Sequence, residues 1–342
     1  MTGSSGRAGS RPPGPWRRWG RVRDAWTLAD VPDLSGRTAV ITGASHGIGA
    51  ATAEHLARGG AYVILACSSP AEGRAAEGAL RARVPSARVV GAGCDLARLD
   101  QVREAAEHIT ALAEGRVDML VNNAGVAALP FTLSVDGHEM HFAVNHLGHF
   151  ALTGHLLPAL LNASEPRVVN VTSVLHWLGR SPSHRARPPA RRYHRWTAYF
   201  DSKLANLLFT YGLAAWASDG GLPLRAIAAH PGLVDTTLGS SALDADGRHL
   251  EARLLRRLQA RWHSPAEAAW PLVRAATDPQ VANGEFLGPG GRWEWSGTPV
   301  RVRAARRARD VHAVERLWRQ SQQLTGHPFP SHPVRPPWEG AF

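Results

Sequence analysis

A tyrosine and a lysine four positions apart have the side chains best suited to chemistry in this sequence. Tyr199 and Lys203 fall in a stretch, 197–216, whose pattern predicts a helix, so both side chains should share one face of it. A tyrosine hydroxyl has a pKa of about 10 and is a poor acid–base group at neutral pH. A nearby ammonium group stabilises the phenolate, and we therefore expect Lys203 to bring the pKa of Tyr199 toward the working range.

The composition of the chain sets Lys203 apart. Of the 39 lysines and arginines, Lys203 is the only lysine. Arginine carries its charge in a planar fork and is a poor substitute where a compact ammonium must reach both a phenol and a ribose. A single lysine at this position therefore indicates a function, not a solvated surface site.

The net charge of +11 on 342 residues is unevenly distributed. Segments 1–35, 176–198 and 296–342 together hold +14, and the rest of the chain holds −3. A nucleic-acid-binding fold carries its charge on its own surface, so we predict no nucleic-acid partner. We interpret the arginine-rich segments as solvated, with an anionic binding partner as the alternative.

Other classes of protein are excluded quickly. Two cysteines, Cys67 and Cys94, are too few for a disulfide framework and have no metal-ligand spacing, so we predict a cytoplasmic protein without a metal. No apolar run approaches the roughly 20 residues of a membrane span, so we expect none. No apolar stretch follows Arg17 and Arg18, which argues against a signal peptide.

Short β-branched runs alternate with helical stretches between residues 36 and 290. We expect strands at 37–42, 61–66, 88–93, 117–121, 167–172 and 224–229, and helices at 48–58, 72–83, 99–113 and 197–216. This alternation predicts an α/β fold: a single Rossmann-type, doubly wound parallel sheet with helices on both faces. Ligands bind at the carboxyl ends of such strands.

A glycine-rich turn follows the first expected strand. Gly43, Gly47 and Gly49 permit a tight turn, a close approach of the backbone to a pyrophosphate and close packing of the next helix. The helix that starts here directs its free N–H groups at the phosphates. The turn also contains Ser45, His46 and Ile48, and we expect it to bind a dinucleotide.

The second expected strand ends without an acidic residue. A carboxylate at this position usually binds the ribose 2′-OH of NAD, whereas cations and hydroxyls suit the 2′-phosphate of NADP. Here Ser68 and Ser69 follow the strand, with His46 and Arg74 in the vicinity, so we predict NADP(H) over NAD(H). The alternative is that the serines only cap a helix.

Polar residues after the later strands complete a candidate site. Ser173 follows the fifth strand and is placed to hydrogen-bond a substrate oxygen. The run 122–125, Asn-Asn-Ala-Gly, follows the fourth strand and suits contacts to an adenosine ribose. Asn145 is polar in an otherwise apolar helix, and a satisfied core amide is an equally good interpretation.

Taken in order, these motifs resemble the short-chain dehydrogenase/reductase family over residues 36 to about 290. They are TGASHGIG at 42–49, CDL at 94–96, NNAG at 122–125, NHLGHF at 145–150, NVTS at 170–173, YFDSK at 199–203 and HPGLVDT at 230–236. The NHLGHF and SKLAN segments are most similar to the retinol-dehydrogenase-like branch, whose members handle lipophilic alcohols, aldehydes and ketones.

The resemblance implies a role for each residue of a catalytic tetrad. Tyr199 would transfer the proton, Ser173 would polarise the carbonyl, Lys203 would bind the ribose, and Asn145 would hold a water of the proton relay. The implied cofactor contacts outside the glycine turn are Ser68, Asp95, Leu96, Asn122, Ala124, Gly125, Tyr199, Lys203, Pro231, Gly232 and Thr236.

The chain departs from this branch in two places. Its relatives usually have arginine where this chain has Ser68, and the separation of 26 between Ser173 and Tyr199 is longer than in many members. We interpret Trp177 and Trp196, at the ends of this longer loop, as anchors and not as walls of a substrate site. The expected organisation is a disordered tail at 1–35, a catalytic domain at 36–295 with an arginine-rich inserted loop at 176–198 and a substrate lid at 237–262, and an extension at 296–342 with a helix at 310–324.

The sequence therefore predicts an NADP(H)-preferring oxidoreductase that transfers a hydride between nicotinamide and a small-molecule secondary alcohol or carbonyl, or a retinol-like alcohol or aldehyde. We expect the substrate to be lipophilic and leave a homo-oligomer open. Two alternatives are a catalytically idle dinucleotide-binding scaffold and an anionic-surface binder that uses the arginine-rich segments.

Overall fold

Eight strands form one sheet in a computed structural model that describes residues 26–180, 190–234, 243–259, 264–327 and 329–330. The strands are β1 (Thr38–Thr42), β2 (Tyr62–Cys67), β3 (Arg88–Gly93), β4 (Met119–Asn122), β5 (Arg167–Val171), β6 (Arg225–Ala229), β7 (Phe286–Pro289) and β8 (Pro299–Arg301). Their order is β3-β2-β1-β4-β5-β6-β7-β8, and only β8 is antiparallel to its neighbour. The predicted doubly wound parallel sheet is confirmed.

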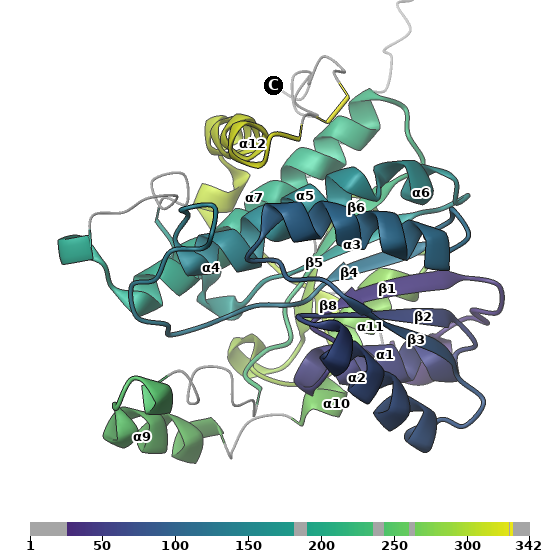
Figure 1. Cartoon of the computed structure of the whole chain (residues 1–342), viewed down its shortest axis with the longest axis horizontal. Helices are drawn as coiled ribbons and strands as arrows, with labels where there is room; N and C mark the ends of the chain where they lie inside the picture. The colour runs from purple at the N-terminus through teal and green to yellow at the C-terminus, as the bar shows by residue number, and fades with distance from the viewer. Residues whose placement is uncertain (1–25, 181–189, 235–242, 260–263, 328, 331–342) are drawn as a thin grey trace, which may run out of the picture.

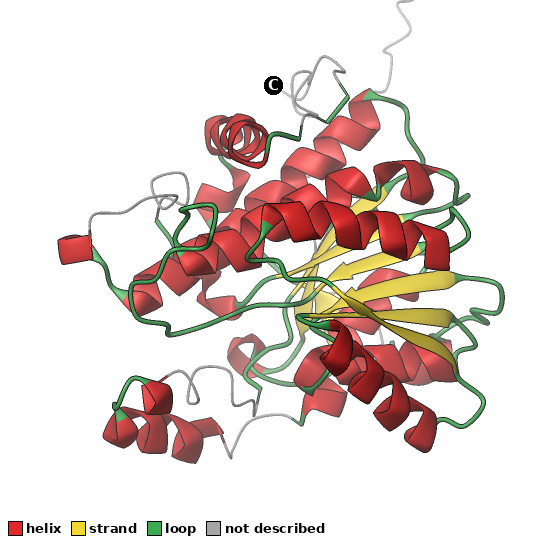
Figure 2. Ribbon diagram, in the orientation of Figure 1, coloured by secondary structure: helices red, strands yellow, loops and turns green. Residues whose placement is uncertain are grey.

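Helices cover both faces of the sheet (Figures 1 and 2). One layer holds α3 (Leu99–Leu112), α5 (Gly148–His155) and α7 (Arg195–Asp219), and the other holds α1 (Gly47–Arg58), α2 (Pro70–Arg83) and α11 (Trp270–Thr277). Successive residues of β1 point to opposite faces, so Val40 joins the core under α5 while Ala39 and Ile41 join the core over α1 and α11. Other helices are α4 (Met140–Phe142), α6 (Leu157–Leu161), α9 (His249–Gln259) and α10 (Pro265–Ala268).

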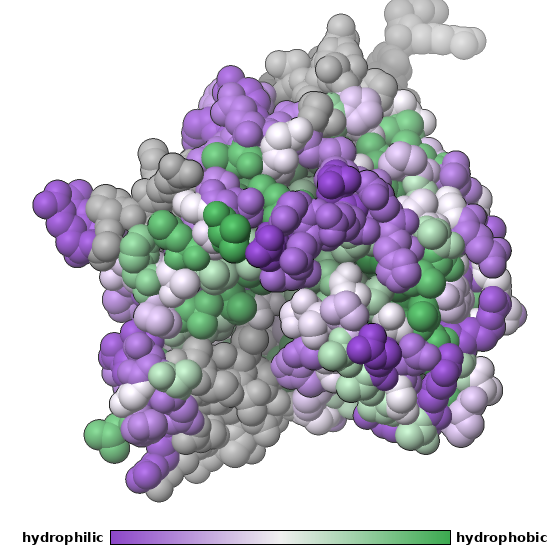
Figure 3. Space-filling model, viewed as in Figure 1, coloured by the Kyte–Doolittle hydropathy of each residue, from purple (hydrophilic) through white to green (hydrophobic). Residues whose placement is uncertain are grey.

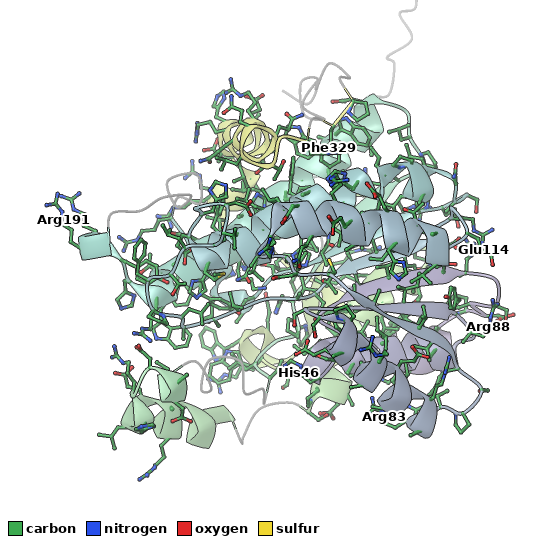
Figure 4. All side chains as sticks on the ribbon, viewed as in Figure 1. His46, Arg83, Arg88, Glu114, Arg191 and Phe329 are labelled. Carbon is green, nitrogen blue, oxygen red and sulfur yellow. The ribbon has the colours of Figure 1, made fainter. Side chains whose placement is uncertain are left out.

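The C-terminal extension packs against the helix that carries Tyr199 and Lys203. The predicted helix at 310–324 is observed as α12 (Val311–Thr325), which lies against α7. Beyond it, Phe329 is buried and packs its ring 4.8 Å from that of Trp318 and 5.5 Å from that of Trp216. The extension therefore supports α7 from its outer side (Figure 4).

The expected boundaries need two corrections. The predicted disordered tail is wrong for residues 26–35, because Trp26 and Leu34 are buried against the α1 core and η1 (Leu28–Asp30) is capped by Thr27. The sheet also continues past residue 295, since β8 pairs with β7. Residues 1–25 lie outside the described part of the chain.

Within the described residues, no helix is long and apolar enough to span a membrane, and no group of histidine, cysteine or acidic side chains is arranged to hold a metal. Cys67 and Cys94 are both free and buried.

Candidate active site

A cleft of about 520 Å³ opens beyond the carboxyl ends of the central strands. This is where a doubly wound sheet binds its ligands. Most of the residues predicted to form the site meet there. Those that line it are Gly43, Ser45, His46, Gly47, Ile48, Gly49, Ser68, Asp95, Leu96, Ala124, Gly125, Tyr199, Lys203 and Pro231.

The glycine turn after β1 forms one wall of the cleft. Gly43 has φ +63° and Gly47 φ +60°, a conformation that side chains disfavour. A Cβ at position 49 would lie 2.3 Å from the carbonyl oxygen of Gly43, so only glycine fits there. Because α1 begins at Gly47, its first N–H groups face this wall and fit the pyrophosphate of a dinucleotide. Figure 4 shows His46 at the same end of α1.

Helix α7 brings Tyr199 and Lys203 to the opposite wall. The Lys203 ammonium lies 5.8 Å from the centre of the Tyr199 ring and donates to the Val171 carbonyl at 3.3 Å. The Lys203 carbonyl accepts from the Thr172 hydroxyl at 2.7 Å, which ties α7 to the end of β5. The pair therefore lies on one face of a helix that is fixed to the sheet.

Burial changes the pKa values of Lys203 and Tyr199 in the directions that favour their neutral forms. It lowers the pKa of Lys203 to about 8. It also raises the pKa of Tyr199, an effect that the hydrogen bond with Ser173 opposes. The expected lowering of the Tyr199 pKa by Lys203 is therefore wrong for this structure, because burial penalises the phenolate more than its neighbours stabilise it. At neutral pH Tyr199 keeps its proton and is available as a donor.

Ser173 and Asn145 lie beside the cleft, next to Tyr199 and Lys203. Ser173 follows β5, caps η3 (Val174–Leu178) and hydrogen-bonds Tyr199. Asn145 lies in a π-helical turn, a feature often found at functional sites. Its side chain accepts from the Val126 N–H at 2.7 Å and donates to the Ser202 hydroxyl at 2.9 Å. The core-amide interpretation of Asn145 thus holds for its side chain, and the water relay stays a prediction.

A buried histidine that the sequence reasoning missed supports this turn. His149 bonds the Asn145 carbonyl through Nδ1 at 3.1 Å and the Thr42 hydroxyl through Nε2 at 2.8 Å. Because a carbonyl only accepts, Nδ1 carries the proton and Nε2 accepts from Thr42. Thr42 in turn accepts from the N–H groups of Asn123 and Ala124, both at 2.9 Å. The signal was available in the NHLGHF motif, where His149 is one helical turn after Asn145.

A carboxylate in the cleft wall beside Ser68 was also missed. Glu72 lines the cleft, and its Oε2 accepts from the Ser68 hydroxyl at 2.6 Å. It belongs to α2, which starts at Pro70 with Ser69 as its cap. The alternative interpretation of the serines is therefore right for Ser69, while Ser68 faces the cleft. Glu72 lies five residues beyond the end of β2, in the first turn of α2 and not at the strand end itself.

Two predicted cofactor contacts, Asn122 and Gly232, do not line the cleft. The Asn122 side chain is buried and donates to Asn170 and Thr153, which places it inside the protein. Gly232 packs against the Trp295 carbonyl, from which a Cβ would be only 2.4 Å away. Thr236 lies outside the described residues, as do residues 181–189 of the predicted arginine-rich loop at 176–198.

Comparison with known proteins decides the family. The sequence model of the short chain dehydrogenase family matches residues 37–246, more than half of the chain. The chain belongs to the short-chain dehydrogenase/reductase family. Accordingly it is an NAD(P)-binding oxidoreductase that acts on CH–OH groups by hydride transfer and takes a small-molecule substrate.

Relatives of this dehydrogenase cover nearly its whole length. Retinol dehydrogenase 12 of Homo sapiens is 38% identical over 294 residues, which is 86% of this chain and 87% of that protein. Polyprenol dehydrogenase of Mus musculus is 36% identical over 316 residues, 90% and 89% of the two chains. A crystal structure of an uncharacterised protein from Mycobacterium paratuberculosis matches with a TM-score of 0.71 at 40% identity and covers 90% of this chain and 99% of that one. The predicted retinol-dehydrogenase-like branch is confirmed.

Proposed function

We propose that this dehydrogenase interconverts a lipophilic alcohol and its carbonyl compound. The observation that carries the proposal is the grouping of Tyr199, Lys203 and Ser173 at one wall of a cleft whose opposite wall is the glycine turn. A hydrogen-bond donor, a cation and a phosphate cradle then face one another across a space suited to a dinucleotide and a carbonyl. The bound nicotinamide supplies or accepts the hydride.

The side chains contribute orientation and one proton. In reduction, the carbonyl oxygen accepts hydrogen bonds from Ser173 and Tyr199, and the Tyr199 hydroxyl delivers its proton to that oxygen as the carbonyl carbon gains the hydride. Lys203 stabilises the phenolate left behind. Burial raises the pKa of Tyr199, which leaves the hydroxyl able to donate its proton. In oxidation the same proton returns to Tyr199.

Two observations support a lipophilic substrate. The cleft is walled beyond the Tyr199 side by Val126, Leu129, Met140 and Val144, all apolar. The relatives named above are a retinol and a polyprenol dehydrogenase, names that denote long apolar alcohols.

Two buried thiols suit a reducing compartment, in keeping with the predicted cytoplasmic localisation.

We keep NADP(H) as the predicted cofactor. Ser45, His46 and Ser68 present hydrogen-bonding groups at the ribose end of the cleft. Glu72 opposes this preference, because its carboxylate is hydrogen-bonded to one of those hydroxyls and would repel a 2′-phosphate.

A screen of the purified full-length protein tests the proposal. Short and long aliphatic aldehydes, ketones and alcohols, with retinal and retinol, are each assayed with NADPH/NADP and NADH/NAD in parallel. We expect turnover that rises with chain length. Absence of turnover with every pair, from protein that still binds a dinucleotide, would favour the idle scaffold.

A further inference from the structure

A strained turn forms part of the apolar wall of the cleft. Residues 126–129, which we call the clamped turn, lie in the connection between β4 and α4. Two of its side chains, Val126 and Leu129, line the cleft. Ala128, between them, is buried and has φ +58°, a left-handed conformation that residues with a side chain rarely adopt. Strain of this kind persists only where the surrounding contacts hold it in place.

Side chains from two other elements hold the first part of the clamped turn. The Asn145 side chain accepts from the Val126 N–H at 2.7 Å and donates to the Val126 carbonyl at 3.0 Å. The Ala128 carbonyl accepts from the Arg195 guanidinium at 3.0 Å. The Ala128 side chain packs in one cluster with Leu243, which belongs to the segment predicted as the substrate lid. The turn is therefore tied both to the π-helical turn of Asn145 and to the start of α7.

His141 and Tyr193 hold the last residue of the clamped turn. The Leu129 N–H donates to His141 Nε2 at 3.3 Å, and the Leu129 carbonyl accepts from the Tyr193 hydroxyl at 3.0 Å. Because Nε2 accepts, the ring proton lies on Nδ1, which donates to Glu139 Oε1 at 2.7 Å. His141 and Glu139 are both fully buried, and the proposed mechanism uses neither. Burial of such groups is costly unless they are hydrogen-bonded, and here their bonds converge on Leu129.

Tyr193 brings the long connection between Ser173 and Tyr199 into this network. Its ring packs edge to face 5.3 Å from that of Phe131, and its hydroxyl also lies 3.2 Å from Glu139 Oε1. Apolar side chains gather on the surface over α4 and beside it (Figure 3). The long connection is thus linked to the outer side of the cleft wall.

The two tryptophans of this connection differ in burial. Trp196 packs against the cluster of Ala128 and Leu243, as predicted for an anchor. Trp177 is 47% exposed, so its expected role as an anchor is wrong.

We propose that Tyr193 and His141 are positioning residues that hold Leu129 in place, so that the clamped turn forms a rigid apolar wall for a long, unbranched substrate chain. This inference deepens the proposed function and rests on it. A long chain would bury its methylene groups against Val126 and Leu129, whereas a short substrate has fewer such groups to bury. A wall that moves loses those contacts, so the network should govern selectivity for chain length.

Tyr193→Phe in the full-length protein tests the positioning role, because it removes the hydroxyl and keeps the ring. The readout is the ratio of kcat/KM for octanal to kcat/KM for propanal, measured with the dinucleotide that gives the faster turnover. We expect this ratio to fall about tenfold, the effect of losing contacts to about two methylene groups.

Tyr62→Phe is the matched control for that measurement. It makes the same chemical change on β2, outside the cleft, and should keep the parent ratio. A general loss of stability lowers both rates together and does not change their ratio. A parent-like ratio in Tyr193→Phe would therefore overturn the proposal.

A double-mutant cycle shows whether Tyr193 acts through Leu129. Leu129→Ala should lower the ratio by itself, and addition of Tyr193→Phe should then lower it little further, because the contact that Tyr193 positions is already lost. If the two effects simply multiply, Tyr193 acts independently of Leu129 and the positioning role is wrong.

Hydrogen exchange tests the network without any turnover. His141→Leu removes the acceptor of the Leu129 N–H, and Tyr193→Phe removes the donor to its carbonyl. Each should speed amide exchange in the peptide that covers residues 126–129 at least about tenfold, while Tyr62→Phe leaves it unchanged. Parent-like exchange in either variant would overturn the proposal. The expected exchange, in a parent protein that turns over no aldehyde or alcohol, would count against the proposed function alone.

Discussion

Glu72 adds a carboxylate to the cleft wall beside Ser68, where we predict the 2′-phosphate of NADP(H). Its carboxylate is exposed and hydrogen-bonded to Ser68, both at the cleft wall. Repulsion between one pair of unit charges costs about 1 kcal/mol at 4 Å in water, and a phosphate carries up to two charges. A ribose 2′-OH carries no charge and is not repelled, and it can donate a hydrogen bond to the carboxylate.

Removing that charge should therefore shift the choice of cofactor. We expect Glu72→Gln to tighten NADPH binding about tenfold relative to NADH, as measured by the dissociation constants from nucleotide fluorescence. Glu104→Gln, an exposed carboxylate of α3, is the control and should change neither constant. An unchanged NADPH-to-NADH ratio in Glu72→Gln would show that Glu72 does not face the 2′ position.

At the scale of elements, α7 depends on the helix and the aromatic side chain that pack outside it. Phe329 is 2% exposed and contacts the rings of Phe150, Trp216 and Trp318 at centroid distances of 4.8 to 5.5 Å. Phe329→Ala would leave a cavity there and should lower the free energy of unfolding by about 3–5 kcal/mol in urea denaturation. Gln323→Ala, exposed on α12, should change it little, and equal effects of both variants would contradict the packing role.

Periodicity was enough to predict the regular elements. The strand at 88–93 was predicted to the residue, and α7 was found but is longer at both ends than 197–216. The last two strands were missed because β7 contains glycine and proline and β8 has three residues, too few for an alternating pattern. Trp26 was assigned to a tail because composition does not reveal its distant contacts in the α1 core.

The candidate site was predicted in part for a similar reason. The glycine spacing and the Tyr199–Lys203 interval are local signals. The glycines of the turn, Tyr199 and Lys203 all line the cleft as predicted. The contacts of Asn122 and Glu72 depend on where separate elements meet. The sequence around Asn122 therefore predicted a cofactor contact, although its side chain is buried, and the sequence around Glu72 predicted no role for it. The sign of the Tyr199 pKa shift depends on burial, which spacing does not report.

At the scale of the whole molecule, buried histidines make the fold sensitive to acid. Burial lowers the pKa of His146 to about 3, and those of His149 and His176 to about 4. In the unfolded chain they titrate at about 6.5. The unfolded state therefore binds more protons between pH 6.5 and about 4, and the free energy of unfolding should fall as the pH drops through that window.

Urea denaturation between pH 7 and pH 4.5 measures this fall. We expect His146→Gln to reduce the slope of the unfolding free energy against pH, since the variant loses a proton that the unfolded chain binds in this pH range and the folded protein does not. His108→Gln, an exposed histidine of α3, should leave the slope as it is. A slope that does not respond to His146→Gln would place the acid sensitivity elsewhere.

The glycine turn and the Tyr199–Lys203 pair line the same cleft, so nucleotide and substrate would meet within one region of the molecule. We propose Tyr199 as the proton donor of this site. The most direct measurement is kcat/KM for carbonyl reduction by Tyr199→Phe, with dinucleotide affinity determined on the same preparation. We expect turnover to fall at least about a hundredfold while the dissociation constant stays nearly unchanged, and Tyr62→Phe, a tyrosine of β2 outside the cleft, to behave as the parent. Undiminished turnover in Tyr199→Phe would contradict the assignment.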